Sequence, residues 1–149
     1  MADRSINQAG IDLIKQFEGC QLAVYADVGG LATVGYGHRC DLPIGDTITQ
    51  EQADDFLSQD LQTAADGVER RILPVDDSIN DNQFASLVAF TFNVGYSNFS
   101  GSTLLKDILD GNLSDVPSQF LRWDKVNGQT VAGLLRRRQA ESDLWSTPV

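Results

Sequence analysis

Two carboxylic acids and one hydroxyl near the start of the chain have residue types and spacing suited to acid–base chemistry. Glu18 ends an apolar run, Asp27 stands nine residues later before a pair of glycines, and Thr33 follows in the segment 31–37. Two carboxyl groups in different surroundings can act as a proton donor and a charged partner. Glycoside hydrolysis needs such a pair, because one acid protonates the leaving oxygen while the other carboxylate handles water or the oxocarbenium ion.

Glu18 is expected to be the protonated member of the pair. The negative end of a helix macrodipole disfavours another negative charge, and partial burial beside an apolar stripe adds to that effect. Asp27 stands in a polar loop and is expected to stay ionised. Acid pairs also occur by chance in a chain with 21 acidic residues, so the pair on its own is a weak signal.

The segment 31–37, LATVGYG, predicts a strand with an open face. Side chains alternate along a strand, which puts Leu31, Thr33, Gly35 and Gly37 on one side. Because two of these residues have no side chain, a polysaccharide could lie close to the backbone, and the Thr33 hydroxyl could hold a water molecule for attack. Turn formation is the commoner reason for such glycines.

Two capping boxes predict the helices that position these residues. The first covers residues 5–8, with Ser5 and Gln8 as its side chains, and opens a helix that ends at Gly19 and carries Glu18 in its last turn. The apolar residues of this helix recur at helical spacing: Ile11, Leu13, Ile14 and Phe17.

A second capping box, Thr49–Gln52, predicts a long helix that closes at Pro74. Between the two helices, short runs broken by glycines over 22–38 predict brief strands. The rest of the chain is predicted to be wholly helical. Its central helix is apolar nearly all round over 84–92, and its last helix runs over about 133–145.

The predicted fold class is therefore α+β, with one domain over residues 1–149. A small N-terminal lobe of about 15–60 bears the sheet. A long helix joins it to an all-helical C-terminal lobe of about 70–149, to which the first helix is added.

The acidic composition argues against two classes of partner. A formal net charge of −10 is unsuited to nucleic acid and to anionic membranes, which both require clustered lysine and arginine. No apolar run approaches the roughly 20 residues that span a bilayer, and the first residues lack the pattern of a secretory signal.

Cys20 and Cys40 are expected to be free thiols, with a bridge left open, and no cysteine or histidine spacing predicts a metal site.

The longer string FEGCQLAVYADVGGLATVGYGH resembles the bacteriophage lysozyme family, which comprises endolysins and muramidases. The likeness continues in the family's order with GDTITQEQA, NQFASLVAFTFNVG, STLLKDILDGN, FLRWDKVNG and GLLRRRQAE, over nearly the full length. The resemblance implies a lysozyme-like fold and no metal or cofactor. It implies hydrolysis, with inversion, of the β-1,4 bond between N-acetylmuramic acid and N-acetylglucosamine in peptidoglycan, for host cell lysis.

The resemblance also implies roles for single residues. Glu18 would protonate the glycosidic oxygen, while Asp27 and Thr33 hold the attacking water on the opposite ring face. Inversion requires carboxyl groups roughly 6.5–9.5 Å apart. His38 would form a structural ion pair with Asp60 on the long helix.

Further residues are expected along the cleft between the lobes. Phe92 and Asn93 fall where the family's helical lobe faces the cleft, although core packing is the commoner role for Phe92. From the run of three arginines, Arg136 is the candidate to approach Glu18, where its charge would oppose the helix dipole. The predicted substrate-binding residues are Gly35, Gly37, Phe92, Asn93 and Arg136.

The expected partner is a peptidoglycan glycan strand, bound by a monomer. The enzyme would stay in the host cytoplasm until a separate membrane-permeabilising protein releases it to the cell wall. Two alternatives stay open: a lytic transglycosylase, which needs no residue to hold water, and a peptidoglycan-binding module without catalysis. The acidic charge departs from the family, in which many members are basic, and predicts long-range repulsion from anionic cell walls.

Overall fold

The computed structural model describes residues 4–149, and its first helix, α1 (Gln8–Glu18), carries Glu18 at its end. The N-cap of α1 is Asn7, whose side chain accepts a hydrogen bond from the Gly10 N–H, so the predicted capping box at residues 5–8 is wrong. The Ser5 hydroxyl instead donates to the side chain of Gln62, 3.1 Å away. Ser5 is thus engaged with another helix and does not cap α1.

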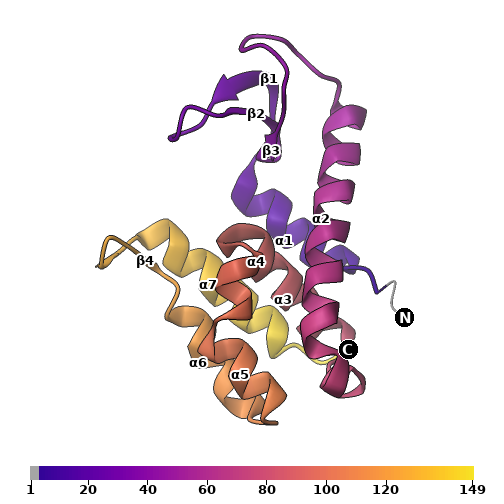
Figure 1. Ribbon diagram of the computed structural model, residues 1–149, viewed down its shortest axis with the longest axis vertical. Helices are drawn as coiled ribbons and strands as arrows, with labels where there is room; N and C mark the ends of the chain where they lie inside the picture. Colours follow the sequence, from indigo (N-terminus) through magenta and orange to yellow (C-terminus); the bar gives the residue numbers. More distant parts are fainter. Residues whose placement is uncertain (1–3) are drawn as a thin grey trace.

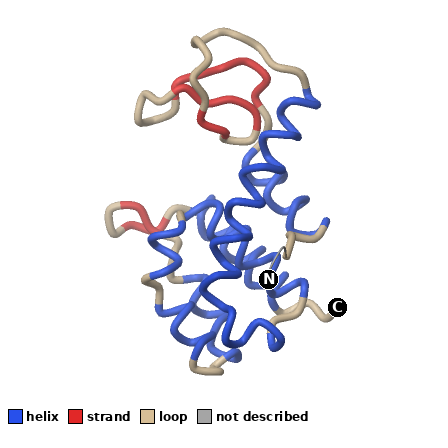
Figure 2. The backbone as a smooth tube through the Cα atoms, turned by 45° about the vertical axis from the view of Figure 1, so that its right-hand side comes forward, coloured by secondary structure: helices blue, strands red, loops and turns tan. Residues whose placement is uncertain are grey.

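The N-terminal lobe holds a three-stranded antiparallel sheet in the order β1-β2-β3 (Figures 1 and 2). The strands are β1 (Gln21–Ala26), β2 (Ala32–Gly35) and β3 (His38–Arg39). Thr33 lies on the central strand, opposite Tyr25 on one side and Arg39 on the other. Cys20 and Cys40 flank the sheet as free thiols, as expected.

A single long helix, α2 (Gln50–Ile72), runs from the sheet lobe into the helical lobe (Figure 1). Its 23 residues span about 35 Å at 1.5 Å per residue. The predicted capping box is confirmed: Thr49 and Gln52 exchange the two reciprocal hydrogen bonds. The helix ends at Ile72, and Pro74 lies in the first turn of the 3₁₀ helix η1 (Leu73–Ser78) that follows.

The helical lobe is built around α3 (Asp81–Val94), in which every residue from Phe84 to Thr91 is buried. Its remaining helices are α4 (Tyr96–Ser100), α5 (Thr103–Leu109), η2 (Leu113–Asp115), α6 (Val116–Leu121) and α7 (Ala132–Trp145). Helices α1, α2 and α7 all pack against α3, as a helix that is apolar all round requires. Over residues 4–149, no helix has the length and apolar character to cross a bilayer.

One part of this lobe contradicts the all-helical prediction. Strands β4 (Lys125–Val126) and β5 (Gln129–Thr130) form an antiparallel hairpin between α6 and α7. Its two turn residues, Asn127 and Gly128, have φ of 52° and 81°. Positive φ at both positions marks the type I′ turn that Asn-Gly favours, so the dipeptide was a hairpin signal that the helical interpretation overlooked.

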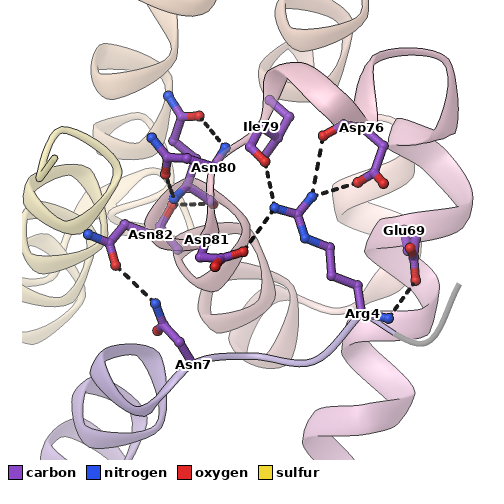
Figure 3. A network of polar contacts seen from close by, with 10 residues as sticks. Arg4, Asn7, Glu69, Asp76, Ile79, Asn80, Asp81 and Asn82 are labelled. Atoms are coloured by element: carbon purple, nitrogen blue, oxygen red, sulfur yellow. Dashed lines mark hydrogen bonds and ion pairs between the residues drawn. The ribbon is translucent and has the colours of Figure 1, made fainter. Parts of the chain in front are cut away.

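Arg4 fastens the segment before α1 to the helical lobe (Figure 3). Its guanidinium lies 2.6 Å from Asp76 and 3.3 Å from Asp81, and its backbone N–H donates to Glu69. The same guanidinium stacks over the ring of Phe84. The start of α1 is thus held in the helical lobe, while its last residue, Glu18, reaches the sheet.

Candidate active site

Glu18 closes α1 with a carboxyl group that is about one-fifth exposed and paired with an arginine. The guanidinium Nη1 of Arg137 on α7 donates to its Oε2 at 2.7 Å. The prediction that Arg136 approaches Glu18 is wrong, because Arg136 is exposed whereas Arg137 is buried. Consecutive residues on a helix point about 100° apart, so only one of the three arginines can face Glu18.

Gly37 brings the turn after β2 against this carboxyl group. A Cβ atom at this position would lie 3.0 Å from Glu18 Oε1, and its φ is +75°. Both observations require glycine here, since other residues rarely adopt that φ. Gly37 therefore lies beside the candidate acid, and its role in substrate binding stays a prediction.

Gly35 does not share that environment, so the predicted glycine-floored face is wrong. It is buried, and a Cβ atom there would lie 3.3 Å from the Cβ of Ala53 on α2. Its φ of +67° ends β2, which breaks the strict alternation of a strand. Gly35 allows the sheet to pack closely on α2, and its role in substrate binding stays a prediction.

Asp27 lies in the loop after β1 and is held in its charged form. Its Oδ1 accepts hydrogen bonds from the N–H groups of Leu31 (2.9 Å) and Gly29 (2.8 Å), and Arg39 Nη2 lies 3.7 Å from its Oδ2. The hydrogen bond from Leu31, helped by that from Gly29 and by the charge of Arg39, lowers the pKa of Asp27. This agrees with the expectation of an ionised aspartate.

Thr33 lies on β2 between the two acids in the chain topology. Asp27 stands in the turn that precedes β2, and Glu18 meets the turn that follows it, at Gly37. The Thr33 hydroxyl donates to the carbonyl of Leu31 at 2.9 Å. Its proton is thus engaged, and its oxygen keeps lone pairs that can accept a further hydrogen bond.

Arg137 belongs to a buried charge network on α7 whose central residue, Glu141, was not among the predicted site residues. Arg137 Nε lies 3.7 Å and Arg138 Nε 2.8 Å from this carboxylate. Burial raises the pKa of Glu141 to about 7, against the opposing pull of Arg138 and Arg137. Its spacing of three and four residues from the two arginines was the available signal, because such residues share a helix face.

Asn93, predicted to bind substrate, belongs to this network. Its side-chain oxygen accepts a hydrogen bond from Arg138 Nη2 at 2.7 Å. That oxygen is engaged within the protein, although the residue as a whole is exposed. Its observed contact is therefore structural support for α7.

Phe92 is half-buried and lines a pocket of about 510 Å³ between α2, α3 and α4. The pocket is also lined by Asp60, Thr63, Ala64, Arg70, Thr91 and Tyr96.

At the edge of this pocket the predicted ion pair is confirmed: His38 Nδ1 lies 2.8 Å from Asp60 Oδ2. The His38 ring also stacks on Phe56, which ties β3 to α2. No group of three or more His, Cys, Asp or Glu side chains within residues 4–149 is arranged to hold a metal ion.

Comparison with known proteins identifies the family. A family model described as phage lysozyme matches residues 15–141. An endolysin of Acyrthosiphon pisum secondary endosymbiont phage 1 is 39% identical over 147 residues, covering 95% of this chain and 98% of that protein. A SAR-endolysin of Bacteriophage PS119 is 37% identical over 132 residues, covering 86% of this chain and 77% of that protein.

A solved structure gives the same result for the fold. The muramidase domain of SpmX from Asticaccaulis excentricus matches with a TM-score of 0.87 at 34% identity, covering 97% of this chain and all of that domain. The expected lysozyme-like α+β fold is confirmed. The chain therefore belongs to the phage lysozyme family and is a peptidoglycan-hydrolysing enzyme.

Proposed function

We propose that this enzyme hydrolyses the β-1,4 bond between N-acetylmuramic acid and N-acetylglucosamine, with Glu18 as proton donor. The observation that carries the proposal is the contrast between two carboxyl groups that flank β2. Asp27 is fixed in its charged form by two backbone N–H groups, while Glu18 lies at the negative end of a helix. Different surroundings of this kind separate an acid from a charged partner.

The contacts of Glu18 support a choice of the oxygen that would carry the proton. Oε2 accepts from Arg137 Nη1, and a guanidinium can only donate. Oε1 lies on the side of Gly37, where a sugar can approach the glycine backbone. We therefore place the transferable proton on Oε1, facing the glycosidic oxygen.

The attacking water is assigned to Asp27 and Thr33. Oδ1 of Asp27 is occupied by backbone donors, whereas Oδ2 has only Arg39 at 3.7 Å, beyond hydrogen-bond range. Oδ2 can accept a hydrogen bond from one O–H of the water and take that proton as the water attacks, while the Thr33 oxygen accepts a hydrogen bond from the other O–H. Attack from this side and protonation by Glu18 on the other would invert the anomeric carbon. The pocket beside Phe92 would take a sugar ring of the same glycan strand.

Two other activities are distinguished by the same experiment. A lytic transglycosylase needs no water, so the fixed charge of Asp27 favours hydrolysis; a binding module would release no fragments at all. Purified peptidoglycan is digested with the wild type and with Glu18→Gln, and the fragments are analysed by mass spectrometry. We expect reducing ends from the wild type and none from Glu18→Gln. Anhydro-muramic ends, or unchanged release by the variant, would contradict the proposal.

We further propose that the enzyme acts as a monomer in host cell lysis and leaves the host cytoplasm through a lesion made by another protein. The cell wall is its site of action. Expression in bacteria with and without a membrane-permeabilising agent tests this route. Lysis that begins without the agent would refute it.

A further inference from the structure

Arg137 is shared between two carboxylates. Its Nη1 lies 2.7 Å from Glu18 Oε2, and its Nε lies 3.7 Å from Glu141 Oε2. Within residues 4–149, these are the carboxylates at ion-pair distance from Arg137. The Arg137 side chain is only 7% exposed and that of Glu141 is fully buried, so solvent does little to screen them.

Glu141 is itself held firmly from the other side. Arg138, also fully buried, contacts both of its oxygens, at 2.8 Å and 3.1 Å. Arg138 is fixed in turn by the oxygen of Asn93 on α3 and by the ring of Phe90. The network therefore leads from α3 through two arginines and Glu141 to the carboxyl group of Glu18.

A proton donor beside an arginine faces a conflict. A guanidinium in contact favours the charged carboxylate, whereas a general acid must hold its proton until the transition state. A second carboxylate on the same guanidinium offsets part of its charge. We propose that Glu141 is a positioning residue that shares Arg137 with Glu18 and thereby offsets the guanidinium charge beside the proposed proton donor. This inference rests on the proposed role of Glu18 as the proton donor.

The pH range of the effect follows from the surroundings of Glu141. Its carboxyl is charged above about pH 7 and neutral below, because burial raises its pKa against the pull of Arg138 and Arg137. The other elements packed on α7 add few charges. α1 contributes Glu18 through Arg137, α3 contributes the uncharged Asn93, and α6 has no titratable side chain. The buried Asp124 after α6 pairs with Lys125.

The test compares Glu141→Gln with the wild type on purified peptidoglycan at pH 6 and pH 8.5. Glutamine imitates the neutral acid, so we expect equal kcat at pH 6. At pH 8.5 only the wild type carries a carboxylate that offsets the charge of Arg137, and an interaction worth about one pKa unit changes protonation tenfold. We therefore expect kcat to fall about five- to tenfold there, with KM unchanged. Glu141→Gln tracking the wild type at both pH values would overturn the inference.

Two further variants separate charge from structure. Glu141→Asp keeps the charge and is expected to stay within about threefold of the wild type at pH 8.5; a loss as large as that of Glu141→Gln would refute a charge effect. Glu69→Gln is the matched control, because Glu69 is also buried but bonds to the Arg4 backbone. It should show no pH-dependent change. Glu18→Gln, inactive at both pH values, tests the proposed function separately.

A measurement on the wild type covers the case in which Glu141→Gln does not fold. The side-chain carboxyl carbons of Glu18 and Glu141 are labelled with ¹³C and followed by NMR from pH 3 to pH 9. When two carboxyl groups interact, each of their signals senses the titration of the other. The ¹³C chemical shift of Glu18 should therefore change at the pH at which Glu141 titrates. A Glu18 signal that is flat through that midpoint would also overturn the inference.

Discussion

Replacing Gly37 by alanine tests whether the turn after β2 presents Glu18 to the substrate. The new Cβ would lie 3.0 Å from Glu18 Oε1, and the residue would keep a φ of +75°. The backbone conformation costs an L-residue about 1–2 kcal/mol, which lowers Tm by about 3–8 °C in a chain of this size. Besides this, Oε1 must move by a few tenths of an ångström or more, and small misplacements of a reacting group can cost up to about 100-fold in rate.

Gly111→Ala is the matched control. Gly111 has a φ of +82°, close to that of Gly37, but a Cβ atom there would have no neighbour within 4 Å. Both variants should therefore lose similar stability in thermal unfolding followed by circular dichroism. Only Gly37→Ala should also lose kcat, by about 10- to 100-fold, in an assay of reducing ends released from peptidoglycan well below either Tm. Wild-type kcat in Gly37→Ala, with the same Tm loss as the control, would refute the proposed geometry.

Three further predictions follow from the described contacts and charges. The pKa of Asp27 is lowered in the folded state, so the charged carboxylate stabilises the fold. This stabilisation is present above the pKa of the unfolded state, about 3.9, and is lost as the pH falls through the pKa of the folded state. The free energy of urea unfolding should therefore depend less on pH below 4 in Asp27→Asn than in the wild type. Arg4→Ala removes the ion pairs with Asp76 and Asp81 and should lower the free energy of unfolding by about 1–3 kcal/mol with kcat unchanged; a large kcat loss would contradict a purely structural role. With a net charge of −10, lysis of whole cells should rise as salt is raised from low levels, since repulsion is screened; steady decline from the lowest salt would refute this.

Local sequence patterns predicted the cap of one helix correctly and that of another wrongly. The Thr49–Gln52 capping box formed as expected, because it lies on an exposed helix start. At the first helix, Ser5 and Asn7 are both residue types that favour the N-cap position; Asn7 takes it, while Ser5 contacts Gln62 on α2. A choice of this kind depends on packing between distant segments, which local propensity does not encode.

The same reasoning explains which site residues were predictable. The surroundings of Asp27 arise from its own loop, so its charged state followed from the sequence. The arginine facing Glu18 depends on how α7 is rotated against α1, and three consecutive arginines give no local sign of that rotation. The prediction of which residues share one face of β2 was wrong for a different reason. Strict alternation of side chains assumes that every residue of the strand has a negative φ, and the φ of Gly35 is positive.

The proposed reaction groups are carried by separate halves of the molecule. Glu18 and its arginine lie on α1 and α7, which both pack on α3, whereas Asp27 lies in the loop after β1 and Thr33 lies on β2. Helix α2 runs between the two lobes (Figure 1). Flexing of α2 would change the distance between the proposed proton donor and the proposed site of the attacking water. A glycan that draws the halves together would thus assemble the reacting geometry as it binds, and the stiffness of one helix would set how readily that happens.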